Sequence, residues 1–167
     1  MPHLMKTISK FFVLALAAVG LTACFDSDYQ ATPRIYAVDA FCTHVDGKRD
    51  TVPFNTESSV VVMLGDSVRV PLFVDGVYHT LTTFNVSGDT SALAYSLSCD
   101  SADMRMLMPD SKPEAGYLHF TETCSGMAVT LYYVAKVKGD FPLTFDLHST
   151  ASESYSHCSL QVIQSVR

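Results

Sequence analysis

Cysteine and histidine are the most reactive side chains of this sequence, and two pairs of them stand close together along the chain. Cys42 and His44 are separated by one residue, and His157 directly precedes Cys158. Either pair could supply two ligands to a metal ion, but no C-x-x-C or H-x-x-x-H spacing supports a zinc site. The G-x-S-x-G motif of a serine hydrolase is also missing from the sequence. We therefore expect no metal, no cofactor and no catalytic residue.

Cys24 differs from the other cysteines because an apolar segment precedes it. Two lysines are followed by FFVLALAAVG (residues 11–20), which has the length of a signal-peptide core and is too short to span a bilayer. The next residues, LTAC, resemble the lipobox of bacterial lipoproteins, in which cleavage before the cysteine is accompanied by its acylation. We predict a signal peptide over residues 1–23, lipidation of Cys24 and a tether over residues 24–33. An ordinary signal peptide that ends near a cysteine is the alternative.

Four cysteines remain after that cleavage, namely Cys42, Cys99, Cys124 and Cys158. An even number in an exported domain favours two disulfides. Cys99 and Cys124 each continue the apolar face of a predicted strand, and a short connection joins them, so we predict that they pair. Pairing of Cys42 with Cys158 would then join the first strand to the last. The alternative is that one pair stays as buried free thiols.

The charge balance excludes one class of partner. The chain has 11 basic and 17 acidic residues, and loss of the two signal-peptide lysines leaves 9 and 17, a net charge of −8. Nucleic-acid binding needs a positive surface, so we expect no nucleic-acid partner. The acyl chains of Cys24 would be the contact with the membrane. Phe25 rather than aspartate follows that cysteine, and we expect sorting to the outer membrane, on its periplasmic face or at the cell surface.

Beyond Pro33 the apolar residues alternate with period two, which predicts half-buried strands. The predicted strands are residues 34–42, 59–64, 67–74, 93–99, 117–124, 127–139, 141–149 and 157–166. Short segments with glycine beside aspartate or lysine separate many of them, as in LGDS and KGDF, and these favour tight turns. Residues 103–108 have a pattern compatible with one helical turn before Pro109. The pattern predicts an all-β fold, an antiparallel β-sandwich over residues 34–167.

Two segments carry a resemblance to a known class of domain. LGDSVRVPL resembles an early strand of bacterial immunoglobulin-like domains, and VAKVKGDFPLTFDLHS resembles their closing hairpin. Together with LTAC, the chain is similar to the small lipoproteins of Bacteroidetes. The resemblance implies an immunoglobulin-like β-sandwich in the cell envelope, and it implies no catalytic residue.

Two features after Cys24 have a meaning specific to Bacteroidetes. Asp26 and Asp28 are similar to a short acidic signal for surface export, although a solvated linker explains them as well. Asp-Ser/Thr-apolar triplets are glycosylated in these bacteria, and three occur here. The hydroxyls concerned are those of Thr51, Ser67 and Ser101.

The function predicted from these observations is that of a lipid-anchored, non-catalytic binding or accessory module whose strand edges or end loops meet an envelope protein or a glycan. A small β-barrel that encloses an apolar ligand is the first alternative. A hydrolase whose site is assembled from distant residues is the second.

Overall fold

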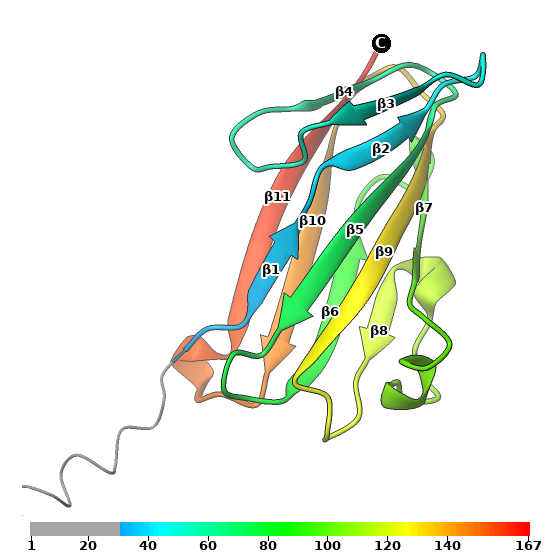
Figure 1. The fold of residues 1–167 in the computed structure, drawn as a ribbon. Coiled ribbons are helices and arrows are strands. Elements are labelled where there is room, and N and C mark those ends of the chain that lie inside the picture. The colour runs from blue at the N-terminus through cyan, green and yellow to red at the C-terminus, as the bar shows by residue number, and fades with distance from the viewer. Residues whose placement is uncertain (1–30) are drawn as a thin grey trace, which may run out of the picture. The chain divides into compact units, whose positions relative to one another are not determined.

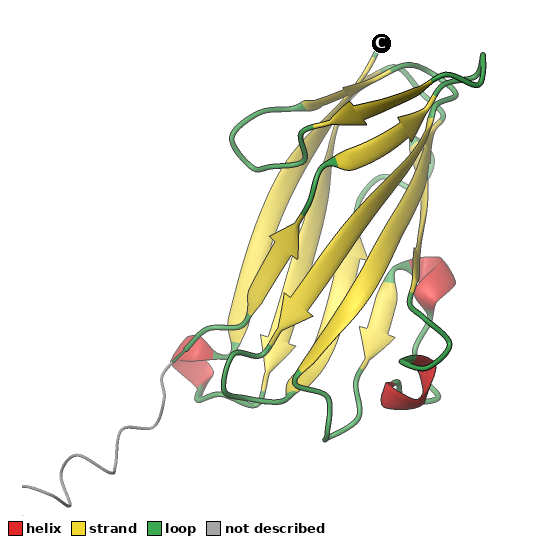
Figure 2. Cartoon of the chain, viewed as in Figure 1, coloured by secondary structure: helices red, strands yellow, loops and turns green. Residues whose placement is uncertain are grey.

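A computed structural model of the chain describes residues 31–167, and strands make up most of their regular structure (Figures 1 and 2). The predicted signal peptide, Cys24 and all but the end of the predicted tether lie outside the described residues. The first strand begins at Arg34, where the sequence predicts it.

Eleven strands and three short 3-10 helices are formed in the described part of the chain. In chain order they are β1 (Arg34–Ala37), β2 (Ala40–Thr43), β3 (Arg49–Val52), β4 (Val60–Val62), β5 (Ser67–Asp75), β6 (Leu81–Ser87), β7 (Leu93–Ser98), η1 (Met104–Met106), η2 (Pro113–Ala115), β8 (Tyr117–His119), β9 (Gly126–Ala135), β10 (Gly139–Ser149), η3 (Glu153–Tyr155) and β11 (His157–Val166).

The strands form two sheets that face each other (Figure 1). The first has the order β3-β2-β5-β9-β7, with β1 also paired to β5, and the second has the order β4-β11-β10-β6-β8. Every pair is antiparallel except β4 with β11. Two separate sheets make this an immunoglobulin-like β-sandwich, as predicted, and the alternative of a closed barrel is wrong.

The core lies between the two sheets and follows the predicted alternation. In β5 the side chains of Val68, Val70, Leu72 and Val74 are buried, while their neighbours along the strand are exposed or half-buried. Strands β9 and β10 repeat this pattern with larger side chains. Every second residue of a strand points to the same face, so the sequence pattern assigns these inward faces correctly.

The predicted strand over residues 34–42 is interrupted, and this changes which face Cys42 occupies. The segment forms β1 and β2 with a break at residues 38 and 39. Tyr36 and Val38 are exposed, but Cys42 is buried. A continuous strand over residues 34–42 would put these three residues on one face, and that expectation is wrong because the break inverts the alternation. Similarly, β9 ends at Ala135, and Val137 is exposed rather than part of the core face.

Within residues 31–167, no helix has the length and apolar character needed to cross a membrane.

Candidate functional site

One end of the first sheet brings together a thiol, an imidazole and two carboxylates. Cys42 lies in β2 and pairs with Val68 of β5 on one side and with Asp50 of β3 on the other. Continuing the β2–β5 register beyond Thr43 and Ser67 sets His44 opposite Asp66. Three adjacent strands thus place the four side chains in one small region, although Asp66 is 22 residues from His44 in the chain.

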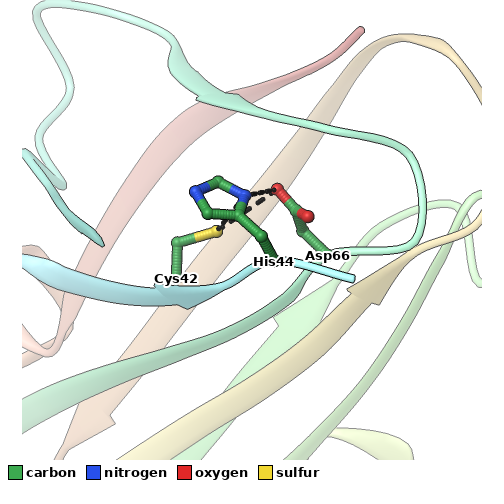
Figure 3. A group of neighbouring side chains, drawn as sticks. All are labelled: Cys42, His44 and Asp66. Atoms are coloured by element: carbon green, nitrogen blue, oxygen red, sulfur yellow. Dashed lines mark hydrogen bonds and ion pairs between the residues drawn. The ribbon is translucent and has the colours of Figure 1, made fainter. Parts of the chain in front are cut away.

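Asp66 is the centre of the cluster formed by Cys42, His44 and Asp66 (Figure 3). Its Oδ2 atom lies 2.9 Å from His44 Nδ1 and 3.4 Å from Cys42 Sγ, and it accepts a hydrogen bond of 2.8 Å from the Met63 backbone amide. Asp66 is 1% exposed, and its other oxygen, Oδ1, is buried with no hydrogen-bond partner in the described part of the chain. Unpaired buried carboxylate oxygens are uncommon, because an unsatisfied polar group costs about 1–3 kcal/mol or more.

A tight turn at residues 63–66 fixes the position of Asp66. The Asp66 amide donates to the Met63 carbonyl, and the Gly65 amide donates to the carbonyl of Ala135 at the end of β9. Gly65 has a φ of +89°, a conformation that favours glycine. The sequence predicts a turn here from LGDS, but it gives no sign that the aspartate of the turn faces β2.

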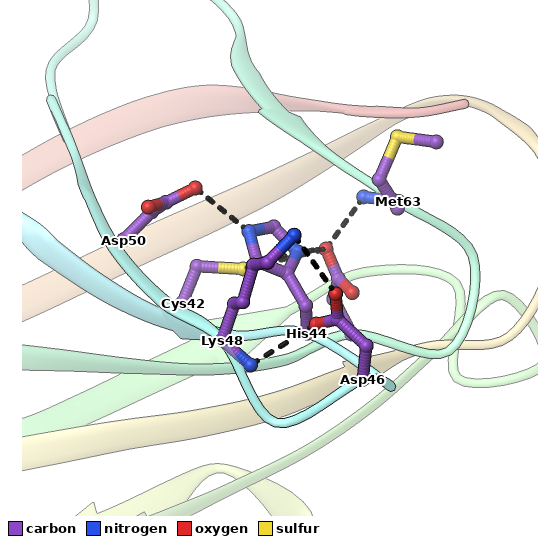
Figure 4. A network of polar contacts seen from close by, with 7 residues as sticks. Cys42, His44, Asp46, Lys48, Asp50 and Met63 are labelled. Carbon is purple, nitrogen blue, oxygen red and sulfur yellow. Dashed lines mark hydrogen bonds and ion pairs between the residues drawn. The ribbon is translucent and has the colours of Figure 1, made fainter.

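His44 bridges the two carboxylates through its two ring nitrogens. Nδ1 lies 2.9 Å from Asp66, and Nε2 lies 2.8 Å from Asp50 Oδ2 (Figure 4). Hydrogen bonds to Asp50 and then to Asp66 raise the pKa of His44 above its usual value. The charged imidazolium is therefore favoured, with both nitrogens donating.

The same residue types occur in thiol hydrolases, but the state of Cys42 argues against that chemistry. Cys42 is 1% exposed, and burial together with the hydrogen bond to Asp66 raises its pKa to about 12. A nucleophilic cysteine needs a lowered pKa and access to substrate. Cys42 instead keeps its proton and donates a hydrogen bond to Asp66 Oδ2.

A shallow depression opens beside the cluster on the solvent side. Its volume is about 450 Å³, and its walls come from the hairpin between β2 and β3 and from the turn before β5. In the hairpin, Asp46 accepts hydrogen bonds from Lys48, as Figure 4 shows. His44, Asp50 and Asp66 all line this depression. A small solute could reach the imidazole and the exposed Asp50 carboxylate from solvent, whereas Asp66 is almost fully buried.

A second feature lies on the outer face of the first sheet, where two rows of side chains cross five strands. One row consists of Thr51, Phe41, Arg69, Tyr132 and Ser96, which are successive partners from β3 to β7. The next row consists of Arg49, Thr43, Ser67, Val134 and Ala94. A groove of about 580 Å³ runs over them, and every member of the two rows except Thr51 lines it. We refer to these ten residues as the outer groove.

The structure does not form the predicted disulfides. Cys42, Cys99, Cys124 and Cys158 are all free thiols. Cys42 pairs with Val68, whereas Cys158 lies beside Ile35, which pairs with Val74 six residues further along β5. At about 3.4 Å per residue the two cysteines are roughly 20 Å apart, and a disulfide needs about 7 Å or less between Cα atoms. The pairing of Cys42 with Cys158 is therefore not compatible with this fold.

Cys99 and Cys124 remain candidates for a disulfide. Cys124 is buried and Cys99 is half-buried against the core, which agrees with the inward direction predicted for both. Burial raises the pKa of both thiols, and the negative charge of Asp103 adds to the increase at each, so both lie near this carboxylate.

The other sequence candidates lie apart from the cluster. His157 stacks on His148 with ring centroids 4.5 Å apart, at the start of β11, and Cys158 does not join a metal-ligand group in the described residues. The three predicted glycosylation positions, Thr51, Ser67 and Ser101, are exposed. Thr51 and Ser67 belong to the outer groove, so a glycan on either would cover part of it.

Comparisons with known proteins add a fold likeness. No protein family matches the chain by sequence, and no curated protein matches it. Among solved structures, a DUF4466 family protein from Parabacteroides merdae is similar over 79% of this chain and 43% of its own length, with 9% identity and a TM-score of 0.45. The C-terminal domain of the AgI/II polypeptide BspA from Streptococcus agalactiae is similar over 80% of this chain and 50% of its own, with 15% identity and a TM-score of 0.45.

Domains 4 and 5 of the S-layer protein SbsC are also similar, over 84% of this chain and 78% of theirs, with 12% identity and a TM-score of 0.37. The chain spans about half the length of the first two structures or less. Likeness at this level carries no argument about function, which is therefore inferred from the residues of the domain itself.

Proposed function

We propose that this protein is a lipid-anchored, non-catalytic binding module of the cell envelope, and that the outer groove binds an anionic glycan. The observation that carries the proposal is the composition of the groove, in which two arginines and two aromatic rings are exposed side by side on a rigid sheet.

Two unpaired guanidinium groups give the outer groove its charge preference. Arg69 lies over the ring of Phe41, 4.9 Å from its centroid, and Arg49 lines the same groove. Within residues 31–167, neither arginine forms an ion pair with a carboxylate. The protein as a whole has a net charge of −6, so these two arginines form a local positive region on an otherwise acidic protein. Guanidinium groups bind carboxylate and sulfate groups well, and the region therefore favours a ligand that carries such groups.

The aromatic side chains favour a sugar over a bare ion. Phe41 and Tyr132 are each 43% exposed, and Arg69 lies between them in the same row. Exposed rings of this kind offer flat apolar surfaces with a polar edge at the tyrosine hydroxyl. Adjacent strands are about 4.8 Å apart, so a row of five side chains presents a surface roughly 19 Å long. An extended chain of linked sugar rings fits such a surface, with the hydroxyls of Thr43, Ser67 and Ser96 available for hydrogen bonds.

Anchoring in the envelope is supported by the sequence before the domain. LTAC at residues 21–24 follows a signal-like apolar segment, and only about ten residues separate Cys24 from β1. A tether of this length would hold the domain close to the membrane and leave the sheet face available to ligands.

Binding of the full chain to an array of acidic and neutral envelope polysaccharides tests the glycan proposal. We expect binding to acidic glycans that weakens with added salt. Arg69→Gln should lower the affinity by about tenfold or more, since a charge-assisted hydrogen bond contributes about 1.5–3 kcal/mol. Tyr132→Ala should also lower the affinity, because it removes the ring on which a sugar would lie. Arg105→Gln, in η1 and outside the groove, is the matched control and should bind as the unaltered chain does.

Three results would contradict the glycan proposal. The first is equal binding of neutral and acidic glycans. The second is binding of the Arg69→Gln variant at the level of the control. The third is retention of a protein, or of a second copy of the chain, by the same face in place of a glycan.

A further inference from the structure

We propose that Cys42, His44 and Asp66 form a binding site for a divalent transition-metal cation of the zinc type, with Cys42 Sγ, His44 Nδ1 and an Asp66 carboxylate oxygen as its ligands. The sequence predicts no metal site at Cys42 and His44, because no C-x-x-C or H-x-x-x-H spacing occurs. The fold supplies the third ligand from the turn before β5.

The distances between the donor atoms fit a tetrahedral ion. Zinc lies about 2.3 Å from sulfur and about 2.0–2.2 Å from nitrogen or oxygen, so tetrahedral geometry sets its ligand atoms roughly 3.3–3.6 Å apart. The observed separations are 3.4 Å from Cys42 Sγ to Asp66 Oδ2, 2.9 Å from His44 Nδ1 to Asp66 Oδ2 and 4.0 Å from Cys42 Sγ to His44 Nδ1. Shifts of about 0.4 Å in the separations of these three donor atoms are enough to place them all at tetrahedral distances from one ion.

Asp50 has the position of a supporting carboxylate. A histidine that binds a metal through one ring nitrogen commonly donates its other N–H to a carboxylate, which fixes the ring and increases its basicity. His44 Nε2 lies 2.8 Å from Asp50 Oδ2, on the opposite side of the ring from Cys42 and Asp66. Asp50 thus orients the imidazole without being a ligand itself.

The deep burial of the Asp66 carboxylate is a second sign that a cation belongs here. All three of the hydrogen bonds to Asp66 converge on Oδ2, while Oδ1 is fully buried and unpartnered in the described part of the chain. A hydrogen-bonded triad alone leaves this oxygen unsatisfied at a cost in stability. A cation in the cluster would compensate the buried carboxylate directly.

The ligand set defines the kind of ion. A thiolate together with an imidazole and one carboxylate favours zinc or a similar borderline cation over calcium or magnesium, which prefer oxygen ligands only. Three protein ligands leave one tetrahedral position, and the depression beside the cluster gives water access to it. On binding, Cys42 gives up its thiol proton and His44 coordinates through Nδ1, while His44 Nε2 keeps its hydrogen bond to Asp50.

Titration of the full chain with cobalt(II) and zinc(II) tests the site. We expect one cobalt per chain with a thiolate-to-cobalt charge-transfer band that zinc abolishes. Calorimetry in buffers of different protonation enthalpy should report net proton release on zinc binding, because the Cys42 thiol is deprotonated when it becomes a ligand. A featureless cobalt spectrum, or calcium displacing cobalt as well as zinc does, would overturn the proposal.

Variants assign the ligands and keep the test independent of folding. Cys42→Ser should remove the charge-transfer band. Asp50→Asn leaves the three ligands in place and should lower the zinc affinity by about 10–100-fold. Asp110→Asn is the matched control, because Asp110 forms a similar pair with His119, 2.8 Å away, on the second sheet. Wild-type zinc affinity in both Cys42→Ser and Asp50→Asn would show that the metal is bound elsewhere, which refutes the assignment even if Cys42→Ser is poorly folded.

Discussion

Tyr132 and Tyr133 are neighbours in β9, but they differ completely in environment. Tyr132 is exposed in the outer groove, whereas Tyr133 is buried in the core and donates a hydrogen bond to Gln164 of β11. Gln164 is also fully buried, so this bond joins the two sheets through a pair of polar groups that have no access to water.

Removal of the Tyr133 hydroxyl should therefore destabilise the protein. Tyr133→Phe leaves the Gln164 amide oxygen without its donor, and we expect the free energy of unfolding to fall by about 1–3 kcal/mol. Tyr132→Phe removes an exposed hydroxyl and should change it by less than about 0.5 kcal/mol. Urea unfolding of both variants measures the difference, and equal stabilities would contradict the role given to the Tyr133–Gln164 bond.

Asp89 gives a pH-dependent contribution to stability. The Ser91 hydroxyl, followed by the Ser91 backbone amide, donates to this carboxylate and lowers its pKa from the usual range. A lowered folded-state pKa means that stability is present above the unfolded-state pKa of about 3.9 and is lost as the pH falls through the folded-state value. The urea midpoint should decrease below about pH 4, and Asp89→Asn should flatten that decrease. If the urea midpoint of Asp89→Asn depends on pH as that of the unaltered protein does, Asp89 does not make this contribution. Glu122→Gln, at an exposed position, serves as the control.

The candidate metal site shows what residue types alone can and cannot reveal. Cys42 and His44 are visible as a pair in the sequence, because period two puts both on one face of a strand. Asp66 is recognisable only as a turn former, since nothing local indicates that β5 pairs with β2 in the register that sets it opposite His44. The site therefore depends on the long-range pairing of β2 with β5, and this pairing cannot be inferred from a single sequence.

At the scale of elements, strands with a regular inward face could be predicted and irregular ones could not. The buried faces of β5, β9 and β10 follow the sequence pattern. Strand β6 was missed because its buried residues, Leu81, Phe84 and Val86, change phase where the pairing with β10 shifts at residues 148 and 149. Strand β3 was missed because it is a short edge strand whose side chains are largely exposed, so it carries no apolar alternation.

The connection from β7 to β8 depends on a glycine at its end. Gly116 follows η2 with a φ of +78°, and its carbonyl accepts a hydrogen bond from Val86 of β6. A Cβ atom there would lie 2.7 Å from the Val86 carbonyl oxygen, whereas at Gly47, which has a φ of +84°, it would meet nothing within 4 Å.

Substitution of these two glycines by alanine separates two costs in stability. One is the cost of the left-handed backbone conformation, which both share, and the other is the cost of the close contact with β6, which only Gly116 has. Gly47→Ala should cost about 1–2 kcal/mol from the left-handed conformation alone. Gly116→Ala should cost clearly more, because the backbone of β6 has to move as well. Thermal or urea unfolding measures both, and a Gly116→Ala variant no less stable than Gly47→Ala would show that this connection is not held tightly against β6.

At the scale of the whole molecule, the Cys99–Cys124 disulfide is the remaining prediction about the cysteines. It would fix the two ends of the segment between β7 and β9 to each other. Cys99 leaves β7 and Cys124 precedes β9, so a bridge between them would close a loop of about 25 residues and stabilise the fold by about 3–4 kcal/mol in the chain-entropy model. Peptide mapping without reduction should give a linked Cys99–Cys124 peptide and a free Cys42. Four alkylatable thiols in the unfolded, unreduced protein would rule the bridge out.

The outer groove and the predicted glycosylation compete for the same surface. Ser67 lines the groove, and Thr51 lies at the end of the row that contains Phe41. A glycan at either position would therefore occupy the place proposed for a ligand. Ser101 lies outside the groove, in the connection after β7. A protein that binds through this face is expected to be modified at Ser101 rather than at Ser67, and glycopeptide mass spectrometry distinguishes the two.

The proposed lipid anchor would decide where the outer groove and the metal site act, and it can be tested directly. If Cys24 is acylated, the protein should partition into the detergent phase and its N-terminal peptide should carry the mass of the acyl chains. Cys24→Ser should leave the protein unprocessed or release it in soluble form, because each acyl methylene that leaves the bilayer forfeits about 0.8 kcal/mol of membrane affinity. Separation of the membranes should place the unaltered protein in the outer membrane, since Phe25 follows the cysteine. A soluble wild-type protein that begins at a residue other than Cys24 would refute the anchor, and the groove and the metal site would then act free of the membrane.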